Sequence, residues 1–335
     1  MTPEHYFRPL VQTDRARPEN AVAIGGGPCW FTKAELLRRD APPRIVSVGD
    51  ISPEILDAIT RPRAKIAGLP TARPLLMGIL NVTPDSFSDG GRFDDQLSAE
   101  NQAATMVAQG ADIIDIGGES TRPGADPVTA EQERARCIPV IKAVRAASPT
   151  IPISIDTRKS DVARAALDAG AAIINDVSAL TYDDKMLDLL KKNQTPVCLM
   201  HAGGDPKTMQ DSPKYEDVLL DVYDFLAARI AHCAANGIDR SRFIVDPGIG
   251  FGKTLAHNLA LIRGLSLFHG LGCRVLLGVS RKAMIGQISG EKTPDRRVAG
   301  SIALGLEAVR QGVQILRVHD VGPTKQALQL WAESR

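Results

Sequence analysis

The amino-acid sequence predicts an α/β protein: a single (β/α)8 TIM barrel preceded by a small N-terminal accessory segment. Short apolar runs recur regularly, helix-period stretches separate most of them, and glycine turns lead from helices into the next runs. A chain of 335 residues is long enough for two ordinary domains. One barrel, however, takes about 250 residues, so the surplus has to be explained.

The surplus lies at the N-terminus. We assign residues 1–73 to the accessory segment or small domain and residues 74–335 to the barrel, because the first 74 residues hold ten of the 22 prolines. Strand-like runs are expected at 21–24 and 45–48, and residues 66–73 read as a connector. A helix is predicted over 32–39, with Thr32 as N-cap and Glu35 three positions later, and another from Ser52-Pro53 to Ile59.

The barrel region alternates between strands and helices, which is typical of parallel βαβ units. The predicted strands begin near eight residues: Leu75, Ile113, Ile153, Ile173, Pro196, Phe243, Arg274 and Ile315. The predicted helices span residues 99–109, 131–146, 161–168, 185–191, 215–236, 254–265, 298–310 and 323–331. Glycine turns such as Gly110-Ala111-Asp112 and Gly170-Ala171-Ala172 follow helices, where glycine adopts the left-handed cap without steric cost.

Composition excludes several functional classes. Lys and Arg number 40 and Asp and Glu 39, and aromatic residues make up 4% of the chain, so we expect no nucleic-acid partner. No run of about 18 apolar residues occurs, and the N-terminus lacks a signal-peptide pattern, so we expect no membrane association. The five cysteines are widely spaced without Cys-x-x-Cys, which indicates a reducing compartment and a cytoplasmic location.

Polar residues gather where the predicted strands end. One polar residue after a strand is usually a cap or turn, but the same feature at every strand end favours a shared site at the C-terminal face of a barrel. The residues concerned include Asn81, Asp115, Asp156, Asn175, Asp176, His201, Asp246, Lys282, Arg317 and His319.

These side chains divide into two groups. Asp156, Asn175 and Asp246 suit a planar heterocycle with amide and amino edges, because carboxylates accept paired N–H bonds and an amide both donates and accepts. Asn81, Arg317 and His319 suit a phosphate or diphosphate. The sequence therefore predicts a phosphorylated heterocycle as ligand.

Two glycine-containing loops, 83–93 and 117–125, are typical of active-site lids.

Some sequence patterns resemble other functional motifs without satisfying them. The run from Gly248 to Thr254 resembles a P-loop but has Pro247 where the motif requires glycine. Lys282 as a Schiff-base lysine is a minor alternative, and His201 is equally well explained as a core histidine. No spacing indicates a transition metal held by the protein.

Two long runs, Met77–Gly91 and Gly110–Gly124, resemble the two signatures of the dihydropteroate synthase family of pterin-binding enzymes. Shorter runs follow in the family's order: Ser154–Thr157, Ile174–Val177, Asp246–Lys253, Gly278–Lys282 and Arg317–Val321. The resemblance covers residues 74–335. It implies a transferase of folate biosynthesis that joins 7,8-dihydropterin-6-ylmethyl diphosphate to 4-aminobenzoate by an SN1-like route.

The resemblance also implies roles for individual residues. Asp156, Asn175, Asp246 and Lys282 would hold the pterin, in a pocket lined by Met200, Gly250 and Phe251. Arg317, His319 and Asn81 would hold the diphosphate, with Asn81 beside Mg²⁺. Asp89 and Arg122, which with Lys282 form the expected catalytic set, would order the loops. The residues expected to shape the 4-aminobenzoate site are Phe87, Thr121, Pro123, Lys282 and Ala283. A homodimer and a sulfonamide target are family-based expectations.

The sequence departs from many relatives after His201, where Ala202-Gly203-Gly204-Asp205 precedes Pro206. This change puts in question any contact of that loop with substrate. Two alternatives remain open. One is a pterin-binding methyltransferase on the same barrel, which would share the Asp/Asn/Asp set, and the other is a relative that binds pterin without catalysis.

Overall fold

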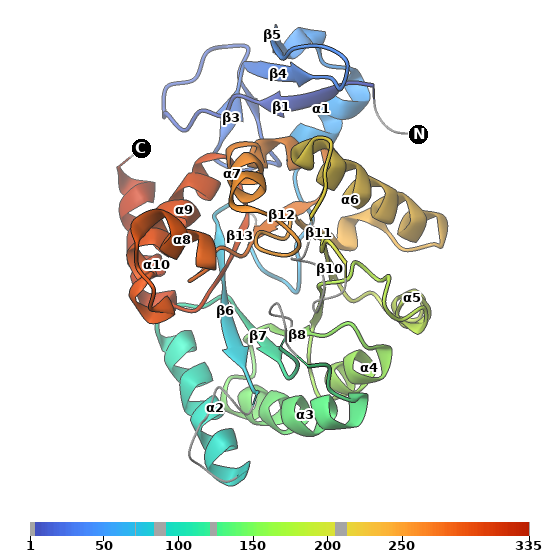
Figure 1. Ribbon diagram of the computed structural model, residues 1–335, viewed down its shortest axis with the longest axis vertical. Helices are drawn as coiled ribbons and strands as arrows, with labels where there is room; N and C mark the ends of the chain where they lie inside the picture. Colours follow the sequence, from blue (N-terminus) through green and yellow to red (C-terminus); the bar gives the residue numbers. More distant parts are fainter. Residues whose placement is uncertain (1–3, 71, 84–91, 121–125, 205–212, 335) are drawn as a thin grey trace.

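The described residues form a closed barrel of eight parallel strands, in the order β10–β11–β12–β13–β6–β7–β8–β9, with β9 paired to β10. The computed structural model describes residues 4–70, 72–83, 92–120, 126–204 and 213–334, with side chains from Leu97 onward in the third range. Helices surround the strands (Figure 1). The predicted (β/α)8 fold is thus confirmed.

The strand predictions are confirmed to within one residue at each start. The barrel strands are β6 (Leu75–Asn81), β7 (Ile113–Gly117), β8 (Ile153–Asp156), β9 (Ile173–Asp176), β10 (Val197–Met200), β11 (Phe243–Asp246), β12 (Arg274–Leu277) and β13 (Ile315–Val318). The helices of this region are α2 (Arg92–Ala108), α3 (Ala130–Ala147), α4 (Ser160–Asp168), α5 (Lys185–Lys191), α6 (Val218–Ala235), α7 (Leu255–Arg263), α8 (Ala283–Ser289), α9 (Val298–Arg310) and α10 (Val321–Glu333). The 3-10 segment η4 (Leu265–Leu271) follows α7.

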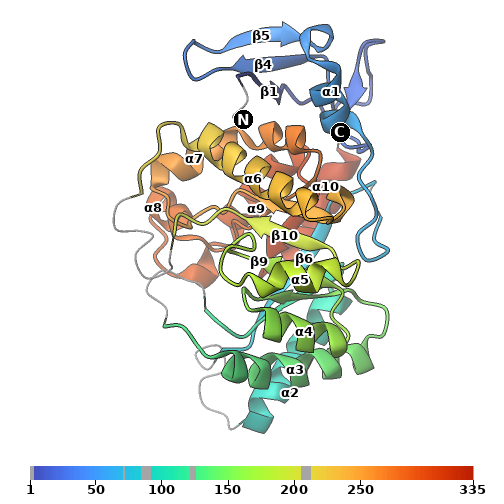
Figure 2. The ribbon, with the colours of Figure 1, turned by 90° about the vertical axis from the view of Figure 1, so that its right-hand side faces the viewer.

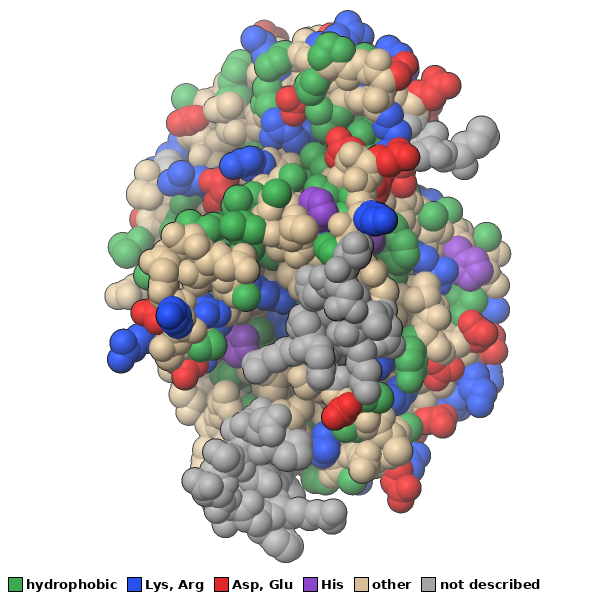
Figure 3. Space-filling model, viewed as in Figure 1, with side chains coloured by type: hydrophobic (Ala, Val, Ile, Leu, Met, Phe, Trp, Pro, Cys, Tyr) green, Lys and Arg blue, Asp and Glu red, His purple; other side chains and the backbone are tan. Residues whose placement is uncertain are grey.

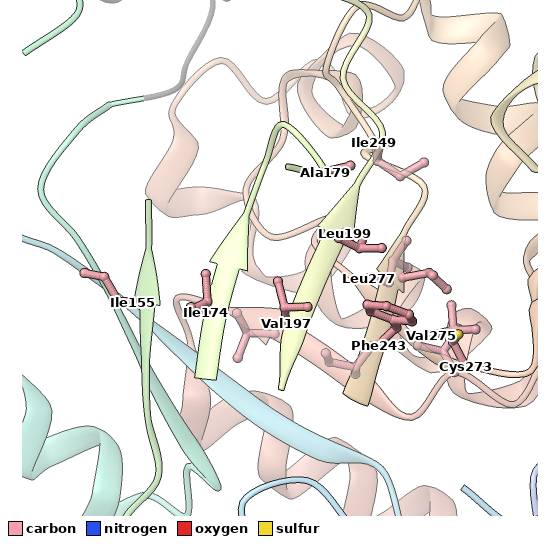
Figure 4. Close-up of a cluster of buried hydrophobic side chains, with 14 of the residues drawn as sticks. Ile155, Ile174, Ala179, Val197, Leu199, Phe243, Ile249, Cys273, Val275 and Leu277 are labelled. Atoms are coloured by element: carbon pink, nitrogen blue, oxygen red, sulfur yellow. The ribbon is translucent and has the colours of Figure 1, made fainter. Parts of the chain in front are cut away.

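Each barrel strand is buried on both faces, which is why the strands read as apolar runs. Side chains facing the helices belong to the main core, and Figure 4 shows several of them, including Ile155, Ile174, Val197 and Phe243. The opposite face of each strand points into the barrel, where Met77, Ile113, Ile173 and others form a separate apolar cluster at the strand starts.

The N-terminal segment forms a sheet of its own in the order β1–β4–β5, beyond α6 in Figure 2. Its elements are β1 (Tyr6–Pro9), β2 (Val22–Ala23), β3 (Trp30–Phe31), β4 (Lys33–Leu37), β5 (Arg44–Ser47) and α1 (Pro53–Thr60). The predicted strand runs correspond to β2 and β5. The helix predicted from Ser52-Pro53 corresponds to α1, with Pro53 at its start.

The helix predicted over 32–39 is wrong, because this stretch forms β4, paired antiparallel with β1 and β5. Ala34 and Leu36 alternate with Lys33 and Glu35, and this period of two buries the first pair in the core of the N-terminal segment. The Thr-x-x-Glu spacing satisfied a helix-capping pattern by coincidence. Helix α8 was not predicted, although α5 has the same length of seven residues; Gly286 in the middle of α8 weakens its helical pattern.

The N-terminal segment packs closely against the barrel. Tyr6 lies in the main core, with its ring edge-on to Tyr223 of α6 at 5.5 Å. Ile66, in the predicted connector, lies in the inner cluster with the strand starts and closes the N-terminal end of the barrel. The boundary at residue 73 stays an interpretation, because side chains on both sides of it share these cores.

No helix in the described ranges is long and apolar enough to cross a membrane. All five cysteines are buried and none forms a disulfide.

Candidate active site

On β6, β7, β9, β11 and β13 the inward-facing row of side chains changes from apolar to polar toward the C-terminal end, and β8 contributes Asp156 at the same level. On β13, for example, inward-facing Ile315 precedes Arg317, and on β11 Ile244 precedes Asp246. Because successive side chains alternate between faces, the polar ends of the rows meet in the barrel mouth. Strand register places Asn81, Gly117, Asp156 and Asn175 side by side on four neighbouring strands.

A hydrogen-bonded set of four side chains crosses this mouth. Nε of Arg317 donates to Oδ2 of Asp115 at 2.6 Å, and Nη2 of Arg317 donates to Oδ2 of Asp156 at 2.7 Å. Nδ2 of Asn175 donates to the same Oδ2 of Asp115 at 3.2 Å. Arg317 therefore ties β13 to β7 and β8.

The sequence interpretation assigned Arg317 to the phosphate group. The structure joins it instead to Asp156 and Asn175 of the ring group, through Asp115. Asp115 was recognised as a strand-end residue but received no role. Its place at the end of a strand could have indicated a role in the site. Its contact with Arg317, 202 residues away in the sequence, could not be predicted because it forms only when the barrel closes.

Burial sets the charge properties of these carboxyl groups. Burial raises the pKa of Asp156 to about 7, and nearby Asp115 adds to the shift while Arg317 opposes it. Burial raises the pKa of Asp246 to about 6, opposed by the Gly248 N–H and Lys282. Burial disfavours the charge on Arg317, but Asp115 and Asp156 outweigh it and raise the pKa of Arg317. The mouth therefore holds two carboxyl groups with raised pKa values, those of Asp156 and Asp246, together with the guanidinium of Arg317, whose charged form is stabilised.

The second wall of the mouth comes from the turn between β11 and α7 and from the segment before α8. Nζ of Lys282 lies 4.2 Å from the ring centroid of Phe251, within cation–π range. A Cβ at Gly250 would lie 3.4 Å from Cδ of Lys282, so the lysine stem passes directly over this glycine. Met200 is buried and registers with Asp246. The structure therefore brings Lys282, Gly250 and Phe251 together, and their role toward the pterin stays a prediction.

The remaining predicted residues lie in different settings. His319 follows β13, and its backbone N–H and Nδ1 lie 3.1 and 3.0 Å from Oγ of Ser280. Asn81 ends β6 with a partly exposed side chain, and Ala283 is exposed at the start of α8. Phe87, Asp89, Thr121, Arg122 and Pro123 lie outside the described residues, as does most of the first predicted lid.

A buried charged network that the sequence did not indicate lies beside the mouth. Glu119 pairs with Arg158 at 3.2 Å and with Lys159 at 3.1 Å, and Lys159 pairs with Glu133 at 2.6 Å. Oε1 of Glu119 also accepts from the Val128 N–H at 3.1 Å. The network fixes the described residues on both sides of 121–125, and no spacing along the chain signalled it.

The donor set at the mouth fits a hard cation carried by phosphate. Within the described ranges no group of three or more His, Cys, Asp or Glu side chains could hold a metal ion. Asn81 offers one amide oxygen, and Mg²⁺ keeps several waters and binds through substrate phosphates with few protein ligands. On the surface shown in Figure 3, acidic and basic side chains are interspersed, so an anionic ligand would depend on the mouth residues.

Comparisons with known proteins agree with this geometry. The family of pterin binding enzymes matches residues 77–319. The dihydropteroate synthase of Escherichia coli (strain K12) is 45% identical over 267 residues, covering 80% of this chain and 94% of that protein. A Xanthomonas albilineans dihydropteroate synthase solved with 4-aminobenzoic acid is 46% identical, with a TM-score of 0.76 over 82% of this chain and 98% of the other. A structure of the enzyme from the same organism with 7,8-dihydropteroate is 43% identical over the same shares, with a TM-score of 0.74.

Proposed function

The chain belongs to the pterin binding enzyme family and is a transferase with dihydropteroate synthase function, and from this premise we propose how its barrel carries out the reaction. The substrates are 7,8-dihydropterin-6-ylmethyl diphosphate and 4-aminobenzoate, and the products are 7,8-dihydropteroate and diphosphate. The observation that carries the proposal is the Asp115–Arg317–Asp156 set in the barrel mouth.

The pterin ring binds against the acidic floor. Its amino and amide N–H groups donate to the carboxylates of Asp156 and Asp246. The Asn175 amide forms a further hydrogen bond with the same edge of the ring. Lys282 and Phe251 close the pocket from the opposite wall, since their side chains already lie together. Shape and hydrogen bonding then select a flat heterocycle with donors along one edge.

Arg317 offsets the negative charge of the buried carboxylates of Asp115 and Asp156. A neutral pterin brings no cation, so the protein has to supply one. Arg317 does so without a conformational change, because it already bonds both Asp115 and Asp156. Its position on β13 also leaves it next to His319, toward the expected diphosphate.

Asn81 and His319 bind the diphosphate end, and Mg²⁺ is the proposed cofactor, which Asn81 would hold together with the substrate phosphates. When bound, the ion would supply positive charge to the departing diphosphate. By family likeness, Asp89 and Arg122 act with Lys282 around the leaving group, and Phe87, Thr121, Pro123 and Ala283 shape the 4-aminobenzoate site.

The bond changes follow from the chemistry of the pterin. The methylene C–O bond breaks, and its electron pair leaves with diphosphate, because the electron-rich ring stabilises the cation. The nitrogen of 4-aminobenzoate then forms the C–N bond, and the resulting anilinium loses a proton to solvent. Positioning and charge stabilisation carry this SN1-like route, so a strong general base is unnecessary.

The proposal extends to the cell and the assembly. Five buried, unbridged cysteines support a cytoplasmic location. The family resemblance supports a homodimer, which light scattering on the purified protein tests directly.

The test of the function combines purified protein, the pterin diphosphate, labelled 4-aminobenzoate and Mg²⁺. We expect labelled dihydropteroate and diphosphate in equal amounts. If neither product forms, the proposed function is wrong. Binding of the pterin without turnover would favour the non-catalytic alternative, and methyl transfer to an acceptor would favour the methyltransferase.

A further inference from the structure

Lys253 is a buried lysine to which the proposed reaction gives no role. It belongs to the glycine-rich run Gly248–Thr254, which resembles a P-loop in sequence but fails its spacing. Only 4% of Lys253 is exposed, so it cannot serve as a phosphate-binding lysine on the surface of the mouth. A lysine is rarely buried without paired contacts, because the ammonium loses its hydration.

The contacts of Lys253 converge on two chain segments. Nζ lies 2.9 Å from Nδ1 of His201 and 3.3 Å from the His201 carbonyl oxygen, at the end of β10. Nζ also donates to the carbonyl oxygens of Gly248 and Phe251, each at 2.9 Å, in the turn after β11. One amine nitrogen therefore holds the end of one strand and both halves of the following strand's turn.

Within this turn the Phe251 N–H donates to the Gly248 carbonyl oxygen at 3.2 Å, and the Gly250 N–H donates to Oδ1 of Asn258 at 2.7 Å. Gly248 has a φ of +68°, a conformation that favours glycine. A Cβ at Gly248 would lie 1.9 Å from the His201 carbonyl oxygen, so the turn contacts the β10 end backbone to backbone. Tyr215 supports the far side, with its hydroxyl donating to the Gly252 carbonyl oxygen at 2.8 Å.

The turn carries the wall of the pterin pocket. Phe251 lies under the Lys282 ammonium, and Gly250 lies under the Lys282 stem. A shift of the turn would therefore move Phe251 and Lys282 together, relative to the carboxylates on the opposite side. Misplacement of about 1 Å in such a site costs roughly a hundredfold in rate.

We propose that Lys253 is a positioning residue, whose Nζ locks the β10 end and the β11–α7 turn into one rigid wall that places Phe251 and Lys282 against the pterin. This inference rests on the proposed function, because positioning Phe251 and Lys282 affects binding only if a pterin occupies the barrel mouth. Lys253 acts through the turn and does not touch the substrate.

The contacts hold in either charge state of the amine. An ammonium donates to Nδ1 of His201 and to the two carbonyl oxygens. A neutral amine donates to the carbonyl oxygens and accepts a hydrogen bond from Nδ1–H of His201. Burial lowers the pKa of Lys253 to about 7 and that of His201 to about 3, so the pair carries at most one charge at neutral pH.

The main variant is Lys253→Met, which keeps the stem and removes the donors. We expect the Kd for the pterin diphosphate to rise roughly tenfold to a hundredfold, measured calorimetrically on folded protein. Lys253→Arg should recover binding only in part, because a planar fork cannot place one nitrogen at three converging acceptors.

The matched control is Arg242→Met. Arg242 is also a buried basic side chain bonded to backbone carbonyls, those of Leu190 and Thr195, at the opposite end of β11. It should lose thermal stability much as Lys253→Met does and leave the pterin Kd unchanged. Equal weakening of pterin binding in both variants would reduce Lys253 to a general structural residue and overturn the proposal.

A second variant covers the case in which Lys253→Met does not fold. His201→Phe removes the Nδ1 partner and keeps a ring beside Phe225, whose ring lies edge-on at 4.9 Å. We expect a severalfold rise in the pterin Kd. A folded Lys253→Met or His201→Phe protein that binds pterin like the wild type overturns the proposal, whereas a wild-type protein that binds no pterin overturns the proposed function.

Discussion

Nη2 of Arg317 lies 2.7 Å from Oδ2 of Asp156, so the last strand of the barrel is bonded directly to the third across its mouth. The same guanidinium bonds Asp115 on the strand between β6 and β8. Removing one partner of a buried ion pair strongly lowers protein stability, because the remaining charge is left buried and unpaired.

Arg317→Met should therefore destabilise the protein in a pH-dependent way. We expect a loss on the order of 3 kcal/mol in unfolding free energy at pH 8, where Asp156 is ionised. The loss should shrink at pH 5, because protonation removes the unpaired charge. Urea unfolding at both pH values measures it, and a loss independent of pH would contradict the assignment of the ion pair.

Pterin affinity should weaken as the pH falls below about 7. The ring N–H groups need carboxylates as acceptors, and the pKa values of Asp156 and Asp246 are raised to about 7 and about 6. Below these values, affinity falls by up to about tenfold per pH unit for each proton that binding must displace. Calorimetry between pH 5.5 and 8 measures it, with the 6-hydroxymethyl pterin as ligand so that no phosphate titrates.

Two controls sharpen this experiment. Titrations in buffers of different ionisation enthalpy should reveal proton release on binding at pH 6. Asp156→Asn should bind weakly at every pH and show a shallower pH dependence. Constant wild-type affinity across the range would mean that the ring does not bind the carboxylates.

Asn81→Ala should raise the Mg²⁺ concentration needed for half-maximal synthase activity, by roughly tenfold if the amide is a ligand. Binding of the 6-hydroxymethyl pterin should be unchanged, because Asn81 is assigned to the diphosphate end. A chelator should abolish wild-type turnover. An unaltered Mg²⁺ requirement in the variant would remove Asn81 from the proposed metal site.

Most of the barrel could be predicted because the strands are buried on both faces, so apolar runs such as Leu75–Asn81 stand out in the chain. The N-terminal sheet was harder. Its strands are short, and in β4 the alternation of Ala34 and Leu36 coincided with a helix-capping pattern. Local signals of similar strength then point to different structures, and only pairing with β1 and β5 decides between them.

The site shows the same division. Asp156, Asn175 and Asp246 could be found because parallel strands in a barrel end on one face. The bond of Arg317 to Asp115 and the contacts of Lys253 with His201 depend on distances set by tertiary packing. No residue spacing carries that information.

His269→Gln should make the protein less sensitive to acid. Burial lowers the pKa of His269 from 6.5 to about 3, so the unfolded chain binds a proton that the folded chain does not between those values. Stability from this residue is therefore lost as the pH falls below 6.5, by up to about 1.4 kcal/mol per pH unit. Glutamine keeps a donor for the Gln311 carbonyl oxygen, which Nε2 contacts at 2.9 Å.

The difference in unfolding free energy between wild type and His269→Gln should narrow from pH 7 to pH 5. The comparison between variants matters because buried acids such as Asp176, whose pKa is raised to about 6 by burial, shift stability in the opposite direction. His232→Gln, at an exposed position on α6, is the control and should follow the wild type.

The contact of Tyr6 with α6 tests whether residues 1–73 are an independent unit. The Tyr6 hydroxyl lies 2.9 Å from Oδ2 and 3.0 Å from Oδ1 of Asp224, and Ser266 of η4 donates to the Pro9 carbonyl oxygen at 2.8 Å. Tyr6→Phe should cost about 1–2 kcal/mol in unfolding free energy and leave turnover unchanged, whereas Arg38→Gln, which removes an exposed pair with Asp40, should cost almost nothing.

Deleting residues 1–60 should expose the apolar surface beneath Tyr6 and yield aggregated protein in size-exclusion chromatography. If the shortened chain is instead monodisperse and as stable as the full chain, the barrel folds without the N-terminal segment.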